Sequence, residues 1–142
     1  MTGERTALLD VTDLVEFLQR RESVSGVQRV IAETAPLLLT RDPGAVAVVL
    51  DRGRGVFVRL DAAETDLLVH RGAGSGNRNP DRDELARGAD AALARARTAT
   101  AAAIDDNTVL VFLGAVWIND ALMLAARQAH SLGARMVYLL YD

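Results

Sequence analysis

The chain has 142 residues and a mass of 15.2 kDa, a size that predicts a single domain. Hydrophobic residues make up 50% and charged residues 25%, which excludes a chain that is disordered throughout. A net charge of −3 and a pI near 5.4 exclude the broad basic surface that nucleic-acid binding usually needs. We therefore expect a globular domain with no nucleic acid among its partners.

The residue types that are missing from the sequence exclude several kinds of functional site. Cysteine is absent and all 16 basic residues are arginine, so thiol nucleophiles, thiolate metal sites and Schiff-base lysines are excluded. His70 and His130 have no metal-ligand partner at close spacing, and we predict no metal site. The longest apolar run, Val109–Ile118, is shorter than the about 20 residues of a transmembrane helix. With no signal-peptide core at the N-terminus, the chain is predicted to be cytoplasmic.

The first third of the chain predicts a strand followed by two helices. Ala7–Val11 has the pattern of a short strand. A capping box is expected to start the first helix, with Thr12 or Asp13 as the N-cap and Glu16 three residues after Asp13. Apolar residues at helical spacing predict the second helix over Val27–Leu38.

The middle third predicts a hairpin, a short helix and a long helix. Ala45–Leu50 is apolar throughout, and Val56–Leu60 alternates as its antiparallel partner strand. After a short helix, Asp81 is expected to cap a long helix rich in Ala and Arg. The turn at 105–107 is expected to end that helix.

The last third predicts a parallel β-α-β unit. Thr108–Leu113 is a strongly apolar strand, and a helix begins at Asn119 or Asp120. Gly133 stands where a glycine often follows a helix, and Arg135–Tyr141 predicts the final strand. Short loops around one helix indicate parallel pairing of its two strands. The elements together predict an α/β fold: a Rossmann-like three-layer sandwich with a mostly parallel sheet and one antiparallel hairpin.

One candidate binding segment is the run Ser25, Gly26, Val27, Gln28 and Arg29. A glycine directly before a helix leaves free N–H groups pointing outward, and the helix dipole favours an anion there. Gln28 and Arg29 lie off the apolar stripe of the helix, so both are free to face a ligand. The plainer interpretation of these residues is a turn between two helices with a surface arginine.

A second candidate group follows the carboxyl ends of predicted strands. Gly114 and Trp117 come after one strand, and Asp142 comes after the last. Ligands of open α/β sheets bind beyond these ends, although a packing tryptophan and a terminal aspartate explain the residues equally. The glycine-rich stretch 72–79 lacks the third glycine of a dinucleotide-binding motif and follows a predicted helix, so no such cofactor is expected.

Several of these segments together resemble the N-terminal half of a bacterial glycosyltransferase of the group 1 family, also called family 4. Members of this family have two Rossmann-like domains that face each other across a cleft, the arrangement known as GT-B. The resemblance spans nearly the whole chain and is weakest over 42–106. The segments that carry it are Leu9–Leu14, Ser25–Val30, Phe112–Ala115 with Trp117, and Leu139–Asp142.

The resemblance implies that residues 1–142 form a single acceptor-side domain and that the donor-binding C-terminal domain is absent. It implies transfer of a sugar from a nucleotide sugar to a glycan or lipid-linked acceptor, in envelope polysaccharide synthesis and without a further cofactor. It also implies, as an alternative location, peripheral contact with the inner face of the cell membrane. The chain alone is expected to be inactive.

The resemblance also implies which residues form the site. Asp142 corresponds to a catalytic residue, and many relatives have a histidine directly before it where this chain has Tyr141. The implied substrate-binding residues are Ser25, Gly26, Val27, Gln28, Arg29, Gly114, Trp117 and Tyr141. A different class of function fits the same fold: a stand-alone flavodoxin-like module that binds a partner or a small anion without catalysis. The fold alone does not separate the two, because such sheets carry many functions.

Overall fold

The computed structural model of the chain describes residues 4–20, 26–72 and 81–139. Three predicted site residues, Ser25, Tyr141 and Asp142, lie outside the described residues, as does most of the glycine-rich stretch 72–79. The described elements are, in chain order, β1 (Thr6–Asp10), α1 (Thr12–Gln19), α2 (Gly26–Arg41), β2 (Val46–Asp51), β3 (Val56–Arg59), α3 (Ala62–Thr65), the π-helical turn η1 (Asp66–Arg71), α4 (Arg82–Ala96), β4 (Thr108–Phe112), the 3-10 turn η2 (Val116–Ile118), α5 (Asp120–Ser131) and β5 (Arg135–Tyr138).

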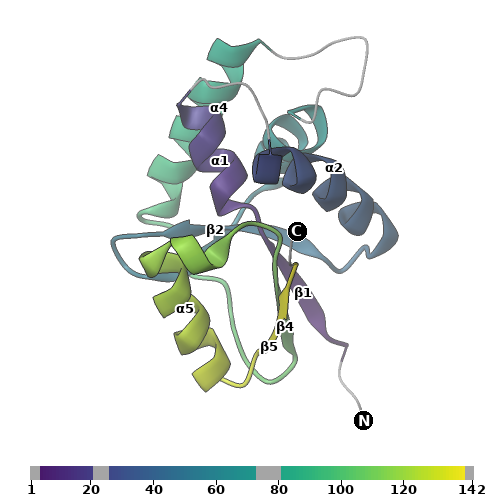
Figure 1. The fold of residues 1–142 in the computed structure, drawn as a ribbon, viewed down its shortest axis with the longest axis vertical. Coiled ribbons are helices and arrows are strands. Elements are labelled where there is room, and N and C mark those ends of the chain that lie inside the picture. Colours follow the sequence, from purple (N-terminus) through teal and green to yellow (C-terminus); the bar gives the residue numbers. More distant parts are fainter. Residues whose placement is uncertain (1–3, 21–25, 73–80, 140–142) are drawn as a thin grey trace.

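The five strands form one sheet in the order β3-β2-β1-β4-β5 (Figure 1). β2, β1, β4 and β5 run parallel, and β3 runs antiparallel to β2. β1 lies at the centre of the sheet, where Leu8 is opposite Val46 of β2 and Leu110 of β4. The predicted α/β fold, with a mostly parallel sheet and one antiparallel hairpin, is therefore confirmed.

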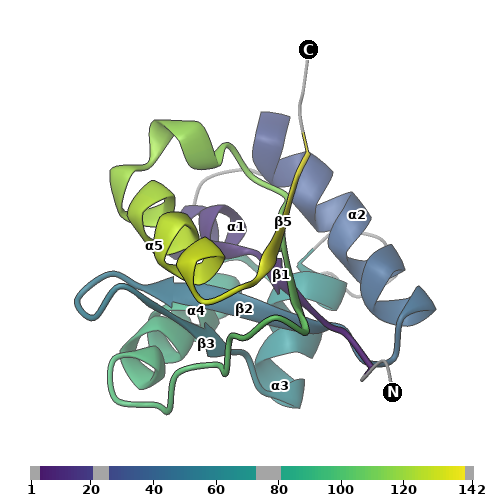
Figure 2. The ribbon, with the colours of Figure 1, turned by 90° about the horizontal axis from the view of Figure 1, so that it is seen from below.

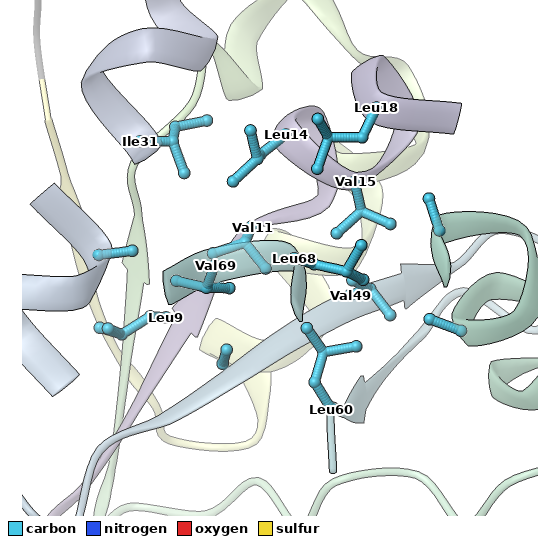
Figure 3. Close-up of a cluster of buried hydrophobic side chains, with 14 of the residues drawn as sticks. Leu9, Val11, Leu14, Val15, Leu18, Ile31, Val49, Leu60, Leu68 and Val69 are labelled. Atoms are coloured by element: carbon cyan, nitrogen blue, oxygen red, sulfur yellow. The ribbon is translucent and has the colours of Figure 1, made fainter. Parts of the chain in front are cut away.

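Helical segments α1, α2, η1 and α4 cover one face of the sheet. Successive strand residues point to opposite faces, so Leu9 of β1 faces this side and Leu8 faces the other. Leu14 of α1, Ile31 of α2 and Leu68 of η1 join Leu9 in the larger of two buried clusters (Figure 3). None of the helices among the described residues is long and apolar enough to span a membrane.

The opposite face is covered by α5 and by Ala102 and Ile104 of the segment that follows α4. Leu122 and Ala126 of α5 belong to the second buried cluster, together with Leu8 and Phe112 of the sheet. Figure 2 shows α5 on one side of the sheet and α2 on the other. The fold is thus a three-layer sandwich, as the sequence predicts.

The long alanine-rich helix ends earlier than the sequence predicts. α4 stops at Ala96, well before the turn that was expected to end it. The Arg54 guanidinium donates hydrogen bonds to the carbonyls of Ala96 and Ala99. Further on, Ala102 N–H donates to the carbonyl of Phe57 in β3 at 2.8 Å. Because these bonds satisfy backbone groups outside the helix, the segment runs along the outer edge of β3 despite its high helix propensity.

The chain leaves β1 and β4 toward opposite faces of the sheet. From β1 it passes through α1 and α2 on one face to reach β2. From β4 it passes through η2 and α5 on the other face to reach β5. In open α/β sheets, ligands bind outside the carboxyl ends of neighbouring strands whose connections diverge in this way. The ends of β1 and β4 are therefore the position where this fold would receive a ligand.

Candidate site at the carboxyl edge

The carboxyl edge of the sheet consists of the last residues of the parallel strands, Asp10, Asp51, Phe112 and Tyr138, and the loops that follow them. α2 also begins at this edge, because it runs back over one face to deliver the chain to the amino end of β2. Figure 1 shows α1 and the start of α2 beyond the carboxyl end of β1. Segments from both faces of the sheet therefore reach one edge.

Asp10, the last residue of β1, is a buried carboxyl group with 2% of its surface exposed. Its Oδ1 accepts hydrogen bonds from Thr12 Oγ1 at 2.5 Å and from Thr12 N at 3.2 Å. The Thr12 hydroxyl in turn accepts a hydrogen bond from Leu50 N of β2 at 2.9 Å. These bonds fasten the start of α1 to the ends of β1 and β2.

The environment of Asp10 moves its titration close to neutral pH. Burial raises the pKa of Asp10 from 3.8 to about 7, because desolvation penalises the charged form. Hydrogen bonds from Thr12 oppose this rise, and the charges of Asp13 and Glu16 add to it. The contribution of Asp10 to the stability of the fold should therefore depend on pH.

The predicted capping box at the start of α1 is wrong. The N-cap residue is Val11, and no side chain caps the helix. Thr12 instead joins β1 to β2, and Asp13 reaches across to the loop after β4. Glu16 pairs with an arginine that follows β2. The polar side chains expected to satisfy the helix end are thus used to connect strands.

Asp13 ties the start of α1 to the loop that follows β4. Its Oδ2 accepts a hydrogen bond from Ala115 N at 3.0 Å. The same carboxylate lies so close to Gly114 that a Cβ at this position would overlap it. Glycine has no Cβ, so Gly114 leaves the room that Asp13 occupies. Gly114 thereby permits the contact that holds together the loops after β1 and β4.

Charged groups extend this network to β2 and α5. Arg52 forms an ion pair with both carboxylate oxygens of Glu16. Arg52 Nη2 lies 2.7 Å from Glu16 Oε1 and 2.8 Å from Glu16 Oε2. Arg52 Nη1 is also 3.4 Å from Oδ1 of Asn119, the N-cap residue of α5. Burial raises the pKa of Asp13, and the positive charge of Arg52 opposes that rise. One connected set of polar groups therefore spans the ends of β1, β2 and β4.

The start of α2 is open to solvent. Gly26 has a φ of +56°, a conformation that favours glycine; apart from its chain neighbours and the backbone of α2, no atom of the described residues lies within 4 Å of where its Cβ would be. The first turn of α2 contains no acidic residue, and the N–H groups and dipole at a helix N-terminus favour an anion. Val27 packs against the core and Gln28 is half-buried. Arg29 is exposed and pairs with Glu33 at 3.1 Å.

η2 presents two large apolar side chains at the same edge, in the loop after β4. Trp117 has 48% and Ile118 has 79% of its surface exposed. The preceding residue, Val116, is buried in the cluster beneath α5, which fixes the position of the turn. An exposed tryptophan offers a flat apolar face with a polar N–H at its rim, which suits stacking against a ring.

The predicted site residues that the structure describes fall into two groups at the carboxyl edge. Gly26, Val27, Gln28 and Arg29 form the start of α2 on one face. Gly114 and Trp117 lie in the loop that leads to the other face. Sequence reasoning missed the polar side chains between these groups, although their signal was present: the polar run Asp10, Thr12 and Asp13 directly follows an apolar strand.

Within residues 4–20, 26–72 and 81–139, no group of three His, Asp or Glu side chains is arranged to hold a metal ion. No family model matches the chain, and comparison with curated proteins and with solved structures finds no significant match. The arrangement at the carboxyl edge is therefore the basis for a functional proposal.

Proposed function

We propose that this chain is the acceptor-side domain of a nucleotide-sugar-dependent glycosyltransferase, which moves a sugar onto a glycan or lipid-linked acceptor. The observation that carries the proposal is the meeting of two open segments at the carboxyl edge. The start of α2 reaches this edge from one face of the sheet, and the loop after β4 reaches it from the other face. The connections that follow β1 and β4 diverge at the same place. Open α/β sheets bind ligands at this position.

The two segments offer the interactions that such a transfer needs. The N–H groups of the first turn of α2, together with the helix dipole, suit the diphosphate that leaves the donor. Arg29 forms an exposed ion pair with Glu33, and its guanidinium is suited to a bidentate contact with phosphate. Trp117 supplies an exposed aromatic face against which an acceptor sugar can stack.

The proposed reaction exchanges one C–O bond for another. The bond between the anomeric carbon and the diphosphate oxygen breaks, and its electron pair leaves with the nucleoside diphosphate. The acceptor hydroxyl oxygen forms the new bond to the anomeric carbon and loses its proton to a carboxylate, for which Asp142 is the proposed residue. Positive potential at the start of α2 stabilises the charge that develops on the diphosphate.

Ligand-observed NMR tests the proposal on the 142-residue chain. Saturation-transfer spectra are recorded with methyl glycosides of glucose, galactose, mannose and N-acetylglucosamine, and separately with UDP and GDP. We expect at least one glycoside to receive saturation, and Trp117→Ala to remove most of that signal because the stacking surface is lost. Leu37→Ala is the matched control, since Leu37 is also exposed but lies on α2, outside its first turn.

Two results would contradict this assignment. If no glycoside binds, or if Trp117→Ala and Leu37→Ala weaken binding equally, the acceptor role fails. Turnover of a nucleotide sugar by the purified chain would show that it holds the donor as well, which overturns an acceptor-side assignment.

A further inference from the structure

Large apolar side chains that are exposed to solvent are concentrated in the last part of the described chain. Of the eight such residues among those described, seven fall between 117 and 138. Scattered single exposures are ordinary, whereas a concentration in one unit is typical of a contact surface. The seven are Trp117, Ile118, Met123, Leu124, Leu132, Val137 and Tyr138.

The region includes an edge strand whose backbone is unpaired on one side. β5 pairs only with β4 among the described strands. Leu139 N–H donates to the carbonyl of Phe112, so the backbone groups of this residue point toward β4. Because these groups alternate in direction along a strand, those of Met136 and Tyr138 point toward the open edge. An open edge of this kind is able to accept another strand.

Two grooves flank this edge, one on each face of the sheet. The groove between α5 and β5 has a volume of about 660 Å³ and an apolar floor that includes Met123 and Met136. The groove beneath α2 runs over β1, β4 and β5, has a volume of about 340 Å³, and is lined by Ala7, Val111 and Val137, among others. Side chains of an added strand alternate between the two faces, so successive residues would enter one groove and then the other.

The charges beside the first groove indicate what the added strand carries. Arg127 and His130 line the groove between α5 and β5, and none of its lining residues is acidic. Arg135 begins β5 and is exposed. Within the described part of the chain, none of these three basic side chains has an ion-pair partner, although the protein as a whole is acidic. A second copy of β5 would bring another Arg127 and His130 to the same groove, which disfavours self-pairing.

We propose that β5 is a docking strand for an extended segment of a partner polypeptide, which adds a sixth strand to the sheet. The segment has apolar residues at successive positions, so that both grooves are filled, and a carboxylate that meets Arg127 and His130. Backbone hydrogen bonds to Met136 and Tyr138 supply affinity, and the grooves and charges supply specificity. This docking strand does not rest on the proposed glycosyl transfer, because it lies along the side of β5 and meets the carboxyl edge only at Tyr138.

Binding of a synthetic peptide tests the docking strand on the 142-residue chain. The probe is the acetylated, fluorescently labelled peptide Glu-Val-Ile-Val-Tyr-Val-Glu, and its control has Lys in place of both Glu. Fluorescence anisotropy should give an affinity for the acidic peptide about tenfold higher than for the basic one, the effect of one charge-assisted contact. Amide hydrogen exchange at Met136 and Tyr138 should slow when the acidic peptide is bound.

Substitutions in the groove and in β5 test which residues contact the peptide. Arg127→Glu should reverse the preference between the two peptides, whereas Arg87→Glu, an exposed change on α4, should leave it unaltered. Met136→Pro removes an N–H that faces the open edge without removing a bond to β4, and should weaken binding of the acidic peptide. Equal affinities for both peptides, or unchanged exchange at Met136 and Tyr138, would overturn the proposal. So would a dimer that protects these amides without peptide, because a second copy would then occupy the edge.

Discussion

The carboxyl edge has two halves that differ in how their polar groups are used. In the buried half, Asp10, Thr12 and Asp13 direct their side chains to partners on β1, on β2 and in the loop after β4. In the open half, Gly26 has no described side chain near its Cα, and Arg29 makes an exposed ion pair with Glu33. The difference indicates that the first half holds the edge together, whereas the second half is the one that we propose contacts a ligand.

We expect substitutions in the two halves to differ in their effect on stability. Removing one member of a buried polar pair leaves the other without a partner, which is costly. Removing an exposed side chain changes stability little, because water replaces its contacts. Changes in the buried half should therefore lower the free energy of unfolding, and changes in the open half should affect binding alone.

The largest expected effect is a dependence of stability on pH that comes from Asp10. In the folded protein the pKa of Asp10 is about 7, whereas its ordinary value, which applies to the unfolded chain, is 3.8. Between these two pH values, unfolding therefore releases a proton. The free energy of unfolding falls as pH rises through this window, by about 4 kcal/mol in total, because the stabilisation present at low pH is lost. Asp10→Asn keeps the oxygen that accepts from Thr12 but does not ionise.

Urea unfolding of both proteins from pH about 4 to about 8 measures this effect. The free energy of unfolding of the wild type minus that of Asp10→Asn should fall across the range. The raised pKa of Asp13 acts in the same direction in both proteins and cancels in the difference. Parallel pH profiles would show that Asp10 is not a buried titrating group.

The next largest effect is expected at Thr12. Thr12→Val keeps the shape of the side chain but removes the hydroxyl that donates to Asp10 and accepts from Leu50 N. The loss leaves two buried groups short of a partner and should cost about 3 kcal/mol. Thr12→Ser keeps the hydroxyl and should cost only about 1 kcal/mol for the lost methyl. Equal losses for the two variants in urea unfolding would contradict the role of the hydroxyl.

A smaller loss is expected at Gly114, where an added methyl group would overlap Asp13. Gly114→Ala should cost about 2 kcal/mol, the usual range for overpacking. In Gly53→Ala the nearest atom to the new methyl, Oδ1 of Asp51, lies 3.6 Å away, and the change should be within about 0.5 kcal/mol. Combining Gly114→Ala with Asp13→Ala should cost less than the sum of the single changes, because the overlap is gone. Additive losses in thermal unfolding would place the cause elsewhere.

The smallest effect on stability is expected in the open half. Arg29→Ala removes one exposed ion pair with Glu33 and should change the free energy of unfolding by less than about 0.5 kcal/mol. Arg54→Ala is the contrasting arginine, since Arg54 donates to the carbonyls of Ala96 and Ala99, and should cost about 2 kcal/mol. A large loss for Arg29→Ala would erase the distinction between the two halves.

The parts of the fold that could be predicted from the sequence are those that depend on local signals. The β4-α5-β5 unit follows from two apolar runs, an Asn119 cap and Gly133, whose φ of +99° confirms its place after the helix. The early end of α4 could not be predicted, because its cause is a set of hydrogen bonds to β3 and Arg54. Alanine-rich sequence favours helix until such bonds compete.

The hydrogen-bond partners in the buried half could not be predicted from the sequence for the same reason, although the polar run itself is visible there. The hydrogen bond from Leu50 N to Thr12 joins residues 38 positions apart, and that from Ala115 N to Asp13 joins residues 102 positions apart. Local patterns assign Thr12 and Asp13 to a helix cap, since no nearby residue indicates another partner. The open half was easier to propose, because a glycine before a helix is a local feature.

The most direct test of the central claim, that ligands contact the open half of the carboxyl edge, is the location of ligand-induced shifts in the ¹H–¹⁵N spectrum of the chain. Methyl glycosides and UDP are titrated separately into the labelled protein. We expect the shifted amides to include Gly26–Arg29 and Gly114–Ile118, with little change at 105–107 and 132–134 on the amino edge. Shifts concentrated at 105–107 and 132–134, or none with either class of ligand, would contradict it.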